Sequence, residues 1–278
     1  MAQRKRPSHL SLLWQQTRYQ NRIFWRTPIS AFFTIAFPLL IFVVFALVFG
    51  NETIDYLGIT TAQFYAPSLA VFAAVSATYT NISVTTAYQR DAGILKRVRG
   101  TPLPAWIYLG GKILSATIVA AMGVTIMLGV GALFFGLQIY PEAVPSLLVT
   151  FFIGVGTFAA LGLLVAAIAP SGPAATAIAN ATILPLAFVS GVFIVLPEDP
   201  PAWLSAVANF FPLKHFVEPF VAAFSPEATR ADFHWADLAY LALWGVVVLA
   251  LAIRFFRWEP STGEGVQVRG RRARATTS

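Results

Sequence analysis

The chain has 278 residues, of which 57% are hydrophobic and only 11% are charged. Soluble domains carry about 25% charged residues, so this composition is that of an integral membrane protein. The sequence contains no cysteine, which excludes disulfides, thiolate metal ligands and cysteine nucleophiles. The net charge of +7 lies in short segments between apolar runs and not on a folded basic domain, so we expect no nucleic-acid partner.

Six stretches are long and apolar enough to cross a bilayer as helices. A hydrocarbon core about 30 Å thick needs roughly 20 residues at about 1.5 Å each. The only charged residue within them, Arg254, lies near a helix end, from which its side chain can reach the headgroups. The sequence therefore predicts an all-α membrane protein with one transmembrane domain over residues 1–260. The expected spans are residues 29–49, 64–84, 113–135, 147–169, 174–196 and 238–256.

The basic residues lie almost entirely on one side of this topology. They fall before the first span, in the loop after the second span, and in the C-terminal tail. The exceptions are Lys214 and Arg230. Because Lys and Arg are retained on the cytoplasmic side of a membrane, we expect both termini to be cytoplasmic.

The segment before the first span is expected to form an N-terminal helix that lies in the membrane interface. At about 100° per residue, its large apolar residues fall on one side and its polar residues on the other. A disordered basic tail is the alternative. The apolar side carries Leu10, Leu13, Trp14, Phe24 and Trp25, and the polar side carries Gln15, Arg18, Arg22 and Arg26.

The loop after the second span, residues 88–104, gathers basic residues around a short apolar face. Ile94, Leu95 and Val98 share this face at helical spacing, and the Gly-Thr-Pro sequence at 100–102 ends the helix. We therefore expect a short amphipathic helix. Such a helix can lie on anionic headgroups or insert its apolar face into a groove of a cytoplasmic partner, and the residues alone leave both open. The basic residues around the face are Arg90, Lys96, Arg97 and Arg99.

The sequence carries no nucleotide-binding motif, and the nearest candidate follows this loop at residues 110–112. A P-loop needs an upstream glycine and a Ser or Thr after its lysine, whereas Lys112, which follows two glycines, is followed by Ile113. We interpret this position as a helix entry at which Lys112 snorkels to the headgroups. The three histidines are far apart in sequence, so no metal site is expected. We expect this chain to bind no cofactor itself.

Four polar residues within the spans are candidates to line a pathway: Thr78, Asn81, Asn180 and Ser190. The alternative, which we favour for any one of them alone, is a hydrogen bond to a neighbouring helix. The spans hold no ionisable group near their middle, which argues against an ion-coupled carrier.

The fourth span is rich in small residues. Gly154, Gly156, Ala160, Gly162 and Ala166 would let neighbouring helices approach closely. They predict a tightly packed bundle and carry no information about a substrate.

Residues 202–224 are apolar enough to suggest a seventh span, but they contain Lys214, His215 and Glu218. Burying a charge at the centre of a bilayer costs about 3 kcal/mol on insertion scales, and a seventh span would place the Arg-rich tail outside the cell. We therefore expect an external re-entrant or interfacial segment of short helices between spans five and six. The tail, residues 261–278, is expected to be disordered and cytoplasmic.

Three segments occur in the order in which a known family carries them. Arg-Thr-Pro at 26–28 leads into a span that contains Pro38 and closes with Phe-Gly at 49–50. Residues 90–103 run from Arg90 through a Gly-Ile-Leu sequence to Thr-Pro-Leu. Residues 184–220 contain an Asn-x-x-Pro turn at 209–212. These segments resemble the first helix, the coupling segment, and the fifth helix with its external re-entrant segment in permeases of type-2 ABC exporters, in particular daunorubicin/doxorubicin-resistance-like drug efflux permeases.

The resemblance implies a permease subunit in a bacterial plasma membrane that forms the path for efflux of a drug, lipid or other amphiphilic metabolite. It also implies a second permease copy or paralogue, and a cytoplasmic ABC ATPase that binds ATP and Mg²⁺. The loop at 88–104 would be the coupling helix, although members of the family commonly carry Glu near the position of Asp91. The residues then expected at the ATPase interface are Arg90, Asp91, Ile94, Leu95, Arg97 and Arg99.

The alternative is an ATP-independent membrane carrier, or a scaffold whose basic loops bind anionic lipid. Membrane lipids are expected partners in either case. The lack of ionisable groups in the spans argues against the carrier. A membrane enzyme is the least favoured function, because the sequence offers no convergent nucleophile and base.

Overall fold

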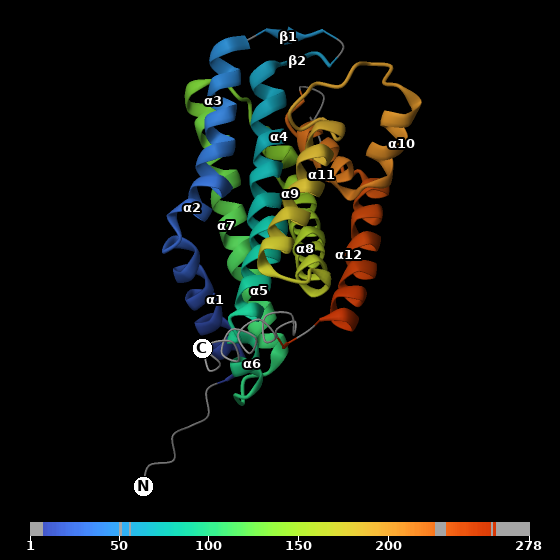
Figure 1. The fold of residues 1–278 in the computed structure, drawn as a ribbon. Coiled ribbons are helices and arrows are strands. Elements are labelled where there is room, and N and C mark those ends of the chain that lie inside the picture. The colour runs from blue at the N-terminus through green and yellow to red at the C-terminus, as the bar shows by residue number, and fades with distance from the viewer. Residues whose placement is uncertain (1–7, 50–51, 56, 226–231, 257, 260–278) are drawn as a thin grey trace, which may run out of the picture.

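Six helical stretches that are long and apolar enough to cross a membrane run side by side in the computed structural model, which describes residues 8–49, 52–55, 57–225, 232–256 and 258–259 (Figure 1). The prediction of an all-α protein with six spans is confirmed for this part of the chain. The predicted tail at 261–278 lies outside the described residues. The six stretches are Pro28–Phe49, Thr61–Asp91, Ala105–Phe134, Pro141–Ile168, Gly172–Val189 and Trp235–Phe255.

Most of the stretches are longer than the predicted spans, and two of them are composite. The first consists of α2 (Pro28–Ala31), the π-helix η1 (Phe32–Ala36) and α3 (Phe37–Phe49). The second consists of α4 (Thr61–Val75), the π-helix η2 (Ser76–Thr80) and α5 (Asn81–Asp91). The others are α7 (Ala105–Phe134), the 3₁₀ turn η3 (Pro141–Ala143) with α8 (Val144–Ile168), α9 (Gly172–Val189) and α12 (Trp235–Phe255).

The predicted boundary of the fifth span was wrong at its C-terminal end. We expected the helix to continue to residue 196, but α9 ends at Val189. Gly191 follows with a φ of 75°, in the left-handed region that glycine adopts without steric cost. The apolar residues after it, such as Ile194, therefore belong to a turn and not to a helix.

Helix α4 lies at the centre of the bundle. All of its residues are buried, and it contacts α3, α7, α8 and α11. Its first turn is fixed by a capping box in which the Thr60 side chain accepts from the Gln63 backbone nitrogen while the Gln63 side chain accepts from the Thr60 nitrogen. The strands β1 (Thr53–Ile54) and β2 (Ile59–Thr60) pair antiparallel just before this cap.

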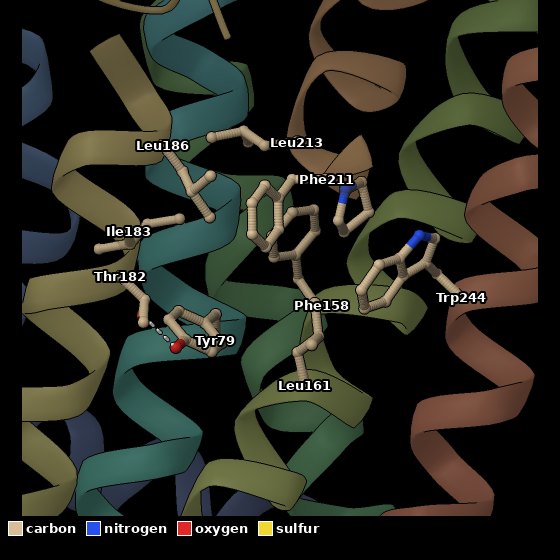
Figure 2. A pocket seen from close by; sticks show the side chains of 10 residues that line it. Tyr79, Phe158, Leu161, Thr182, Ile183, Leu186, Phe211, Leu213 and Trp244 are labelled. Carbon is tan, nitrogen blue, oxygen red and sulfur yellow. Dashed lines mark hydrogen bonds between the residues drawn. The ribbon is translucent and has the colours of Figure 1, made fainter. Parts of the chain in front are cut away.

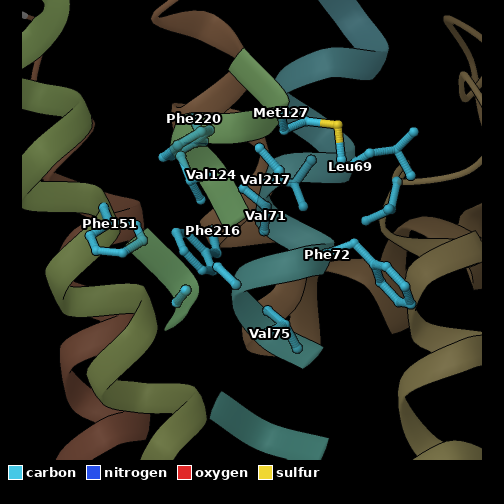
Figure 3. Packing of buried hydrophobic residues seen from close by; sticks show 14 of the residues in the cluster. Leu69, Val71, Phe72, Val75, Val124, Met127, Phe151, Phe216, Val217 and Phe220 are labelled. Carbon is cyan, nitrogen blue, oxygen red and sulfur yellow. The ribbon is translucent and has the colours of Figure 1, made fainter. Parts of the chain in front are cut away.

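The apolar core forms where α4 meets α7, α8 and α11 (Figure 3). Leu69 of α4 lies close to Met127 of α7, and Val71 of α4 lies on the side of Phe216 of α11, whereas the ring of Phe72 contacts Phe193. Because lipid chains are as apolar as these side chains, close packing and not the hydrophobic effect holds such helices together inside a bilayer. The outer faces of α3 and α12 carry large exposed apolar residues such as Val48 (70% exposed) and Val246 (68%), as a lipid-facing surface requires.

The predicted N-terminal helix is present as α1 (His9–Trp25), which packs along α7. Its apolar residues do not share one environment, however. Phe24 faces the bundle with the polar residues Thr17 and Gln20, whereas Leu10 and Trp14 remain exposed. The two helices approach closely because α7 has Gly111 there, and a Cβ atom at that position would lie 2.5 Å from Cγ of Gln16.

Two short helices, α10 (Ala202–Phe210) and α11 (Pro212–Ala222), occupy the segment in which a seventh span was rejected. With 9 and 11 residues, neither alone reaches across a hydrocarbon core about 30 Å thick. Helix α11 inserts between α4, α8 and α12, while α10 stays at the rim (Figure 1). His215 fixes the pair to α12, because its Nδ1 lies 2.6 Å from Oδ1 of Asp237 and its Nε2 lies 2.9 Å from the carbonyl oxygen of Asn209.

Candidate functional site

The corner between α5 and α6 (Ile94–Arg99) holds the residues that we expected at the ATPase interface. Gly93 has a φ of 69° and separates the two helices by a left-handed turn. Leu95 is fully buried under this corner, whereas Ile94 is 38% exposed and Arg97 and Arg99 are exposed. The apolar face of α6 is therefore shared between the interior of this chain and its surface.

Arg90 lies inside the protein and joins this corner to α8. Its side chain is 3% exposed, and its two terminal nitrogens donate to the carbonyl oxygens of Ala166 and Ala169, each at 2.8 Å. The last carbonyls of a helix lack partners within the helix and carry partial negative charge, so a guanidinium satisfies both needs. Arg90 thus closes the C-terminal end of α8.

Asp91 performs the matching role at the start of α9. Its Oδ2 accepts a hydrogen bond from the backbone nitrogen of Gly172 at 2.6 Å, where the amide groups of a helix N-terminus favour an anion. Its Oδ1 lies 3.4 Å from Arg90. A side chain at position 172 would collide with the ring of Tyr88, which lies 2.7 Å from the position of a Cβ atom. We call Arg90, Asp91 and Gly172 the α8–α9 clasp.

The six expected interface residues therefore fall into two groups. Ile94, Arg97 and Arg99 lie on the surface of α6. Arg90 and Leu95 are buried, and Asp91 is largely occupied by the clasp, so these three are positioned to hold α6 against the bundle. No sequence signal separated the two groups, because all six fit one short helix.

Asn81 and Asn180, two of the four candidate pathway residues, line one groove. Its volume is about 500 Å³, within the range of ligand pockets, and it lies between the first, second and fifth spans. Phe33, Phe37 and Phe72 give it a mainly apolar wall. We call it the main groove.

The other two candidates lie elsewhere. Thr78 is fully buried and donates to the carbonyl oxygen of Ala74 on its own helix, at 2.8 Å. Ser190 is buried beside a different pocket of about 590 Å³ at the β1–β2 end of the bundle, which Glu198 and Lys214 also line. Thr78 therefore bonds within its own helix, and the alternative of a hydrogen bond to a neighbouring helix does not describe it.

Both π-helices border the main groove, a feature that the sequence did not reveal. Phe33 and Thr34 belong to η1, while Ser76 and Thr80 belong to η2, and the two π-helices contact each other. A π-helix widens a turn by one residue and is frequent at functional sites. Its presence depends on how neighbouring helices pack, so hydropathy gives no sign of it.

A smaller apolar pocket of about 130 Å³ lies between α8, α9, η2 and α12, and Figure 2 shows its lining. The hydroxyl groups of Tyr79 and Thr182 lie 2.5 Å apart on one wall. Phe158, Phe211 and Trp244 form the opposite wall. The hydrogen bond joins the second span to the fifth span. These two spans and the first span line the main groove.

The prediction that Lys112 snorkels to the headgroups was wrong. Its side chain is buried at 4% exposure, and Nζ donates to Oγ1 of Thr86 at 2.8 Å and to Oε1 of Gln89 at 2.7 Å. The lysine turns inward because α7 begins at Ala105, a full two turns before Lys112, and α1 covers this side of α7. The polar cluster around Lys112 was therefore missed by sequence reasoning.

Comparison with known proteins gives a family match over most of the chain. A family model described as "ABC-2 type transporter" matches residues 11–225, from α1 to the end of α11. The chain is 30% identical over 198 residues to the daunorubicin resistance ABC transporter permease protein DrrB1 of Streptomyces coeruleorubidus. The aligned region covers 68% of this chain and 66% of that protein. It is 23% identical over 199 residues to the probable multidrug ABC transporter permease YbhR of Escherichia coli K12, covering 72% and 50%. The chain thus spans about half to two thirds of the length of these curated relatives.

Proposed function

This chain is a permease domain of the ABC-2 type transporter family, and from that premise we propose that it forms the membrane path of an exporter driven by a separate ABC ATPase. The match over residues 11–225 carries the proposal. ATP and Mg²⁺ would be bound by the ATPase. The proposed cargo is a drug, lipid or other amphiphilic metabolite, in keeping with relatives named for daunorubicin resistance and for multidrug transport.

The main groove is the proposed path. It combines an aromatic wall with the amides of Asn81 and Asn180, and this mixture suits a molecule that is partly apolar and partly polar. The groove opens at one side of the bundle, so we propose that a second copy of the permease, or a paralogue, completes it. Membrane lipids would border the remaining apolar faces.

Helix α6 is the proposed contact with the ATPase. Ile94 offers an exposed apolar side chain flanked by Arg97 and Arg99, a pattern that fits an apolar groove with acidic edges on a partner. The α8–α9 clasp would carry a displacement of α6 to the ends of α8 and α9. Because α9 lines the main groove, such a displacement would bias the groove between its inward- and outward-facing states.

The proposed orientation places α6 and both termini in the cytoplasm of a bacterial cell, with β1, β2 and α10 outside. The distribution of Lys and Arg supports this orientation. An introduced cysteine tests it, because the chain contains none. A membrane-impermeant maleimide applied to intact cells should label Leu57→Cys and leave Ile94→Cys unlabelled until the cells are lysed.

The function is tested by recovering the partner. Affinity purification of the chain from native membranes should yield a P-loop ATPase, and Ile94→Cys should form a crosslink to it through a short bifunctional reagent. Leu57→Cys is the matched control, since Leu57 is also exposed (40%) but lies between β1 and β2, which are at the end of the bundle opposite α6 (Figure 1). Efflux should depend on ATP and persist when a protonophore is added at constant ATP.

Recovery of the chain alone, together with efflux that continues without ATP, would overturn the proposal. Efflux that a protonophore abolishes at constant ATP would favour an ion-coupled carrier instead. An Ile94→Asp variant that still recovers the ATPase in full would remove α6 as the contact while leaving the export function in place.

A further inference from the structure

Lys112 is a buried lysine without an acidic partner among the described residues. It takes part in none of the ion pairs found there, and its two hydrogen bonds go to the neutral side chains of Thr86 and Gln89. A buried charge is costly unless it is paired and hydrogen-bonded. An ammonium group has three protons, so two hydrogen bonds leave one donor unused.

A second unused donor lies nearby on α1. Gln20 is buried at 7% exposure, and its Nε2, which faces the Tyr108 hydroxyl group, makes no well-formed hydrogen bond within the described part of the chain. Buried polar groups in native proteins are nearly always paired, so each exception needs an explanation. Gln20 and Lys112 line the same recess between α1, α5 and α7, which has a volume of about 60 Å³.

The rest of the recess also supplies hydrogen-bond donors. Asn81 and Ser115 contribute an amide and a hydroxyl group, and no carboxylate is among the lining residues. A recess with one lysine, several neutral donors and no acid is suited to an anion, which would favour the ammonium form of Lys112. It disfavours a cation, which would face Lys112 in a site largely shielded from water.

The recess adjoins the main groove, because Ser30, Asn81 and Thr85 line both. The two neighbouring spaces therefore offer a small polar part around Lys112 and a larger apolar part along Phe33 and Phe72. We propose that together they bind an amphiphile with an anionic headgroup, such as a phosphate or carboxylate, with the headgroup at Lys112 and Gln20 and the apolar part along the main groove.

The identification of this amphiphile as the transported cargo rests on the proposed export function. Its binding does not, because the recess belongs to this chain alone. If no ATPase is recovered but the anionic amphiphile binds, only the export function fails. If an ATPase is recovered but anionic and zwitterionic amphiphiles bind equally, only the present inference fails.

Binding is measured on the full chain purified in a neutral detergent, by native mass spectrometry with lipids that share the same two oleoyl chains. Dioleoyl phosphatidic acid should bind about tenfold more tightly than dioleoyl phosphatidylcholine, the size expected for a charge-assisted hydrogen bond. Dodecyl phosphate should compete for the site, whereas dodecyltrimethylammonium and inorganic phosphate should not. Competition by inorganic phosphate at the same concentration would reduce the site to a simple anion site and overturn the role of the groove.

Two substitutions test the residues. Lys112→Met should lower the affinity for phosphatidic acid to that for phosphatidylcholine, and Lys214→Met, which removes a lysine at the β1–β2 end, is the matched control and should change nothing. Gln20→Leu removes a donor that makes no well-formed hydrogen bond among the described residues, so the variant should fold normally and bind phosphatidic acid several-fold more weakly. Phosphatidic acid binding that stays unchanged in both Gln20→Leu and Lys112→Met would overturn the proposal. If Lys112→Met fails to fold, unchanged binding in Gln20→Leu is enough to overturn it.

Discussion

Nη2 of Arg90 donates to the carbonyl oxygen of Ala169 at 2.8 Å, although the two residues are 79 positions apart in the chain. This bond, with the bond from Nη1 to Ala166, fixes the end of α8 to the C-terminal end of α5, which the turn at Gly93 joins to α6. Asp91 extends the contact to the start of α9. Helix α6, the proposed contact with the ATPase, is therefore connected to α8 and α9 through the end of α5 and its three side-chain hydrogen bonds.

We expect Arg90→Met to lower the free energy of unfolding by about 3 kcal/mol. The substitution leaves the carbonyl oxygens of Ala166 and Ala169 buried without donors, and hydrogen bonds to a charged group contribute about 1.5–3 kcal/mol each. Unfolding in mixed detergent and SDS, followed by far-UV circular dichroism, measures the change. Arg99→Met, on the exposed side of α6, is the control and should change the stability by less than about 0.5 kcal/mol. Equal effects of the two substitutions would contradict the clasp.

Leu95 and Ile94 are adjacent, but we expect their substitutions to act on different properties. Leu95→Ala should reduce stability by about 2–5 kcal/mol, because the side chain is fully buried and its removal leaves a cavity. Ile94→Ala should leave stability nearly unchanged, because Ile94 is 38% exposed. In the purification described above, Ile94→Ala should weaken ATPase recovery while the chain itself remains stable. A stable Leu95→Ala variant would mean that α6 is not held against the bundle as described.

Gly162 and Gly156 lie on the same helix and provide a matched pair. A Cβ atom at Gly162 would lie 2.8 Å from the carbonyl oxygen of Tyr79 and 3.0 Å from that of Thr78, and backbone atoms cannot rotate away. We therefore expect Gly162→Ala to destabilise the protein by about 1–3 kcal/mol through overpacking. Gly156 has no atom within 4 Å of that position, so Gly156→Ala should be neutral or slightly stabilising. Thermal unfolding in detergent distinguishes the two, and similar melting temperatures would argue against close contact between α8 and η2.

The hydroxyl groups of Tyr79 and Thr182 should be energetically coupled. Oγ1 of Thr182 already donates to the carbonyl oxygen of Ile178 at 2.7 Å, so the Tyr79 hydroxyl is the donor of the bond between them. A double-mutant cycle with Tyr79→Phe and Thr182→Val should give a coupling of about 0.6 kcal/mol, with an upper limit of about 1.7 kcal/mol, as hydrogen bonds between membrane helices do. Tyr140→Phe, combined with Thr182→Val, is the control cycle and should give no coupling, because Tyr140 bonds to Gln138. A coupling of zero for Tyr79 as well would mean that the bond does not stabilise the bundle.

The sequence by itself determined the class of the protein, the number of spans in the described part of the chain and the presence of a short helix within residues 88–104, although Arg90 and Asp91 belong to the end of α5 and not to that helix. Each of these properties depends on a local window of residues. About 20 apolar residues cross a bilayer whatever surrounds them, and an apolar face at helical spacing identifies a short helix. Residues such as Lys214, His215 and Glu218 likewise sufficed to exclude a seventh span, because the cost of burying charge in lipid is large.

Only the tertiary structure decided what individual side chains meet. Lys112 follows two glycines near a helix entry, and its sequence context predicts an exposed amine, but α1 packs over Gly111 and leaves the ammonium in a buried recess. Arg90 and Arg97 were both expected beside the apolar face in the loop at 88–104. In the structure Arg90 closes the end of α8, whereas Arg97 lies on the surface. The physical reason is that hydropathy sums over a segment, whereas the surroundings of a single charge depend on which helices, distant in sequence, lie beside it.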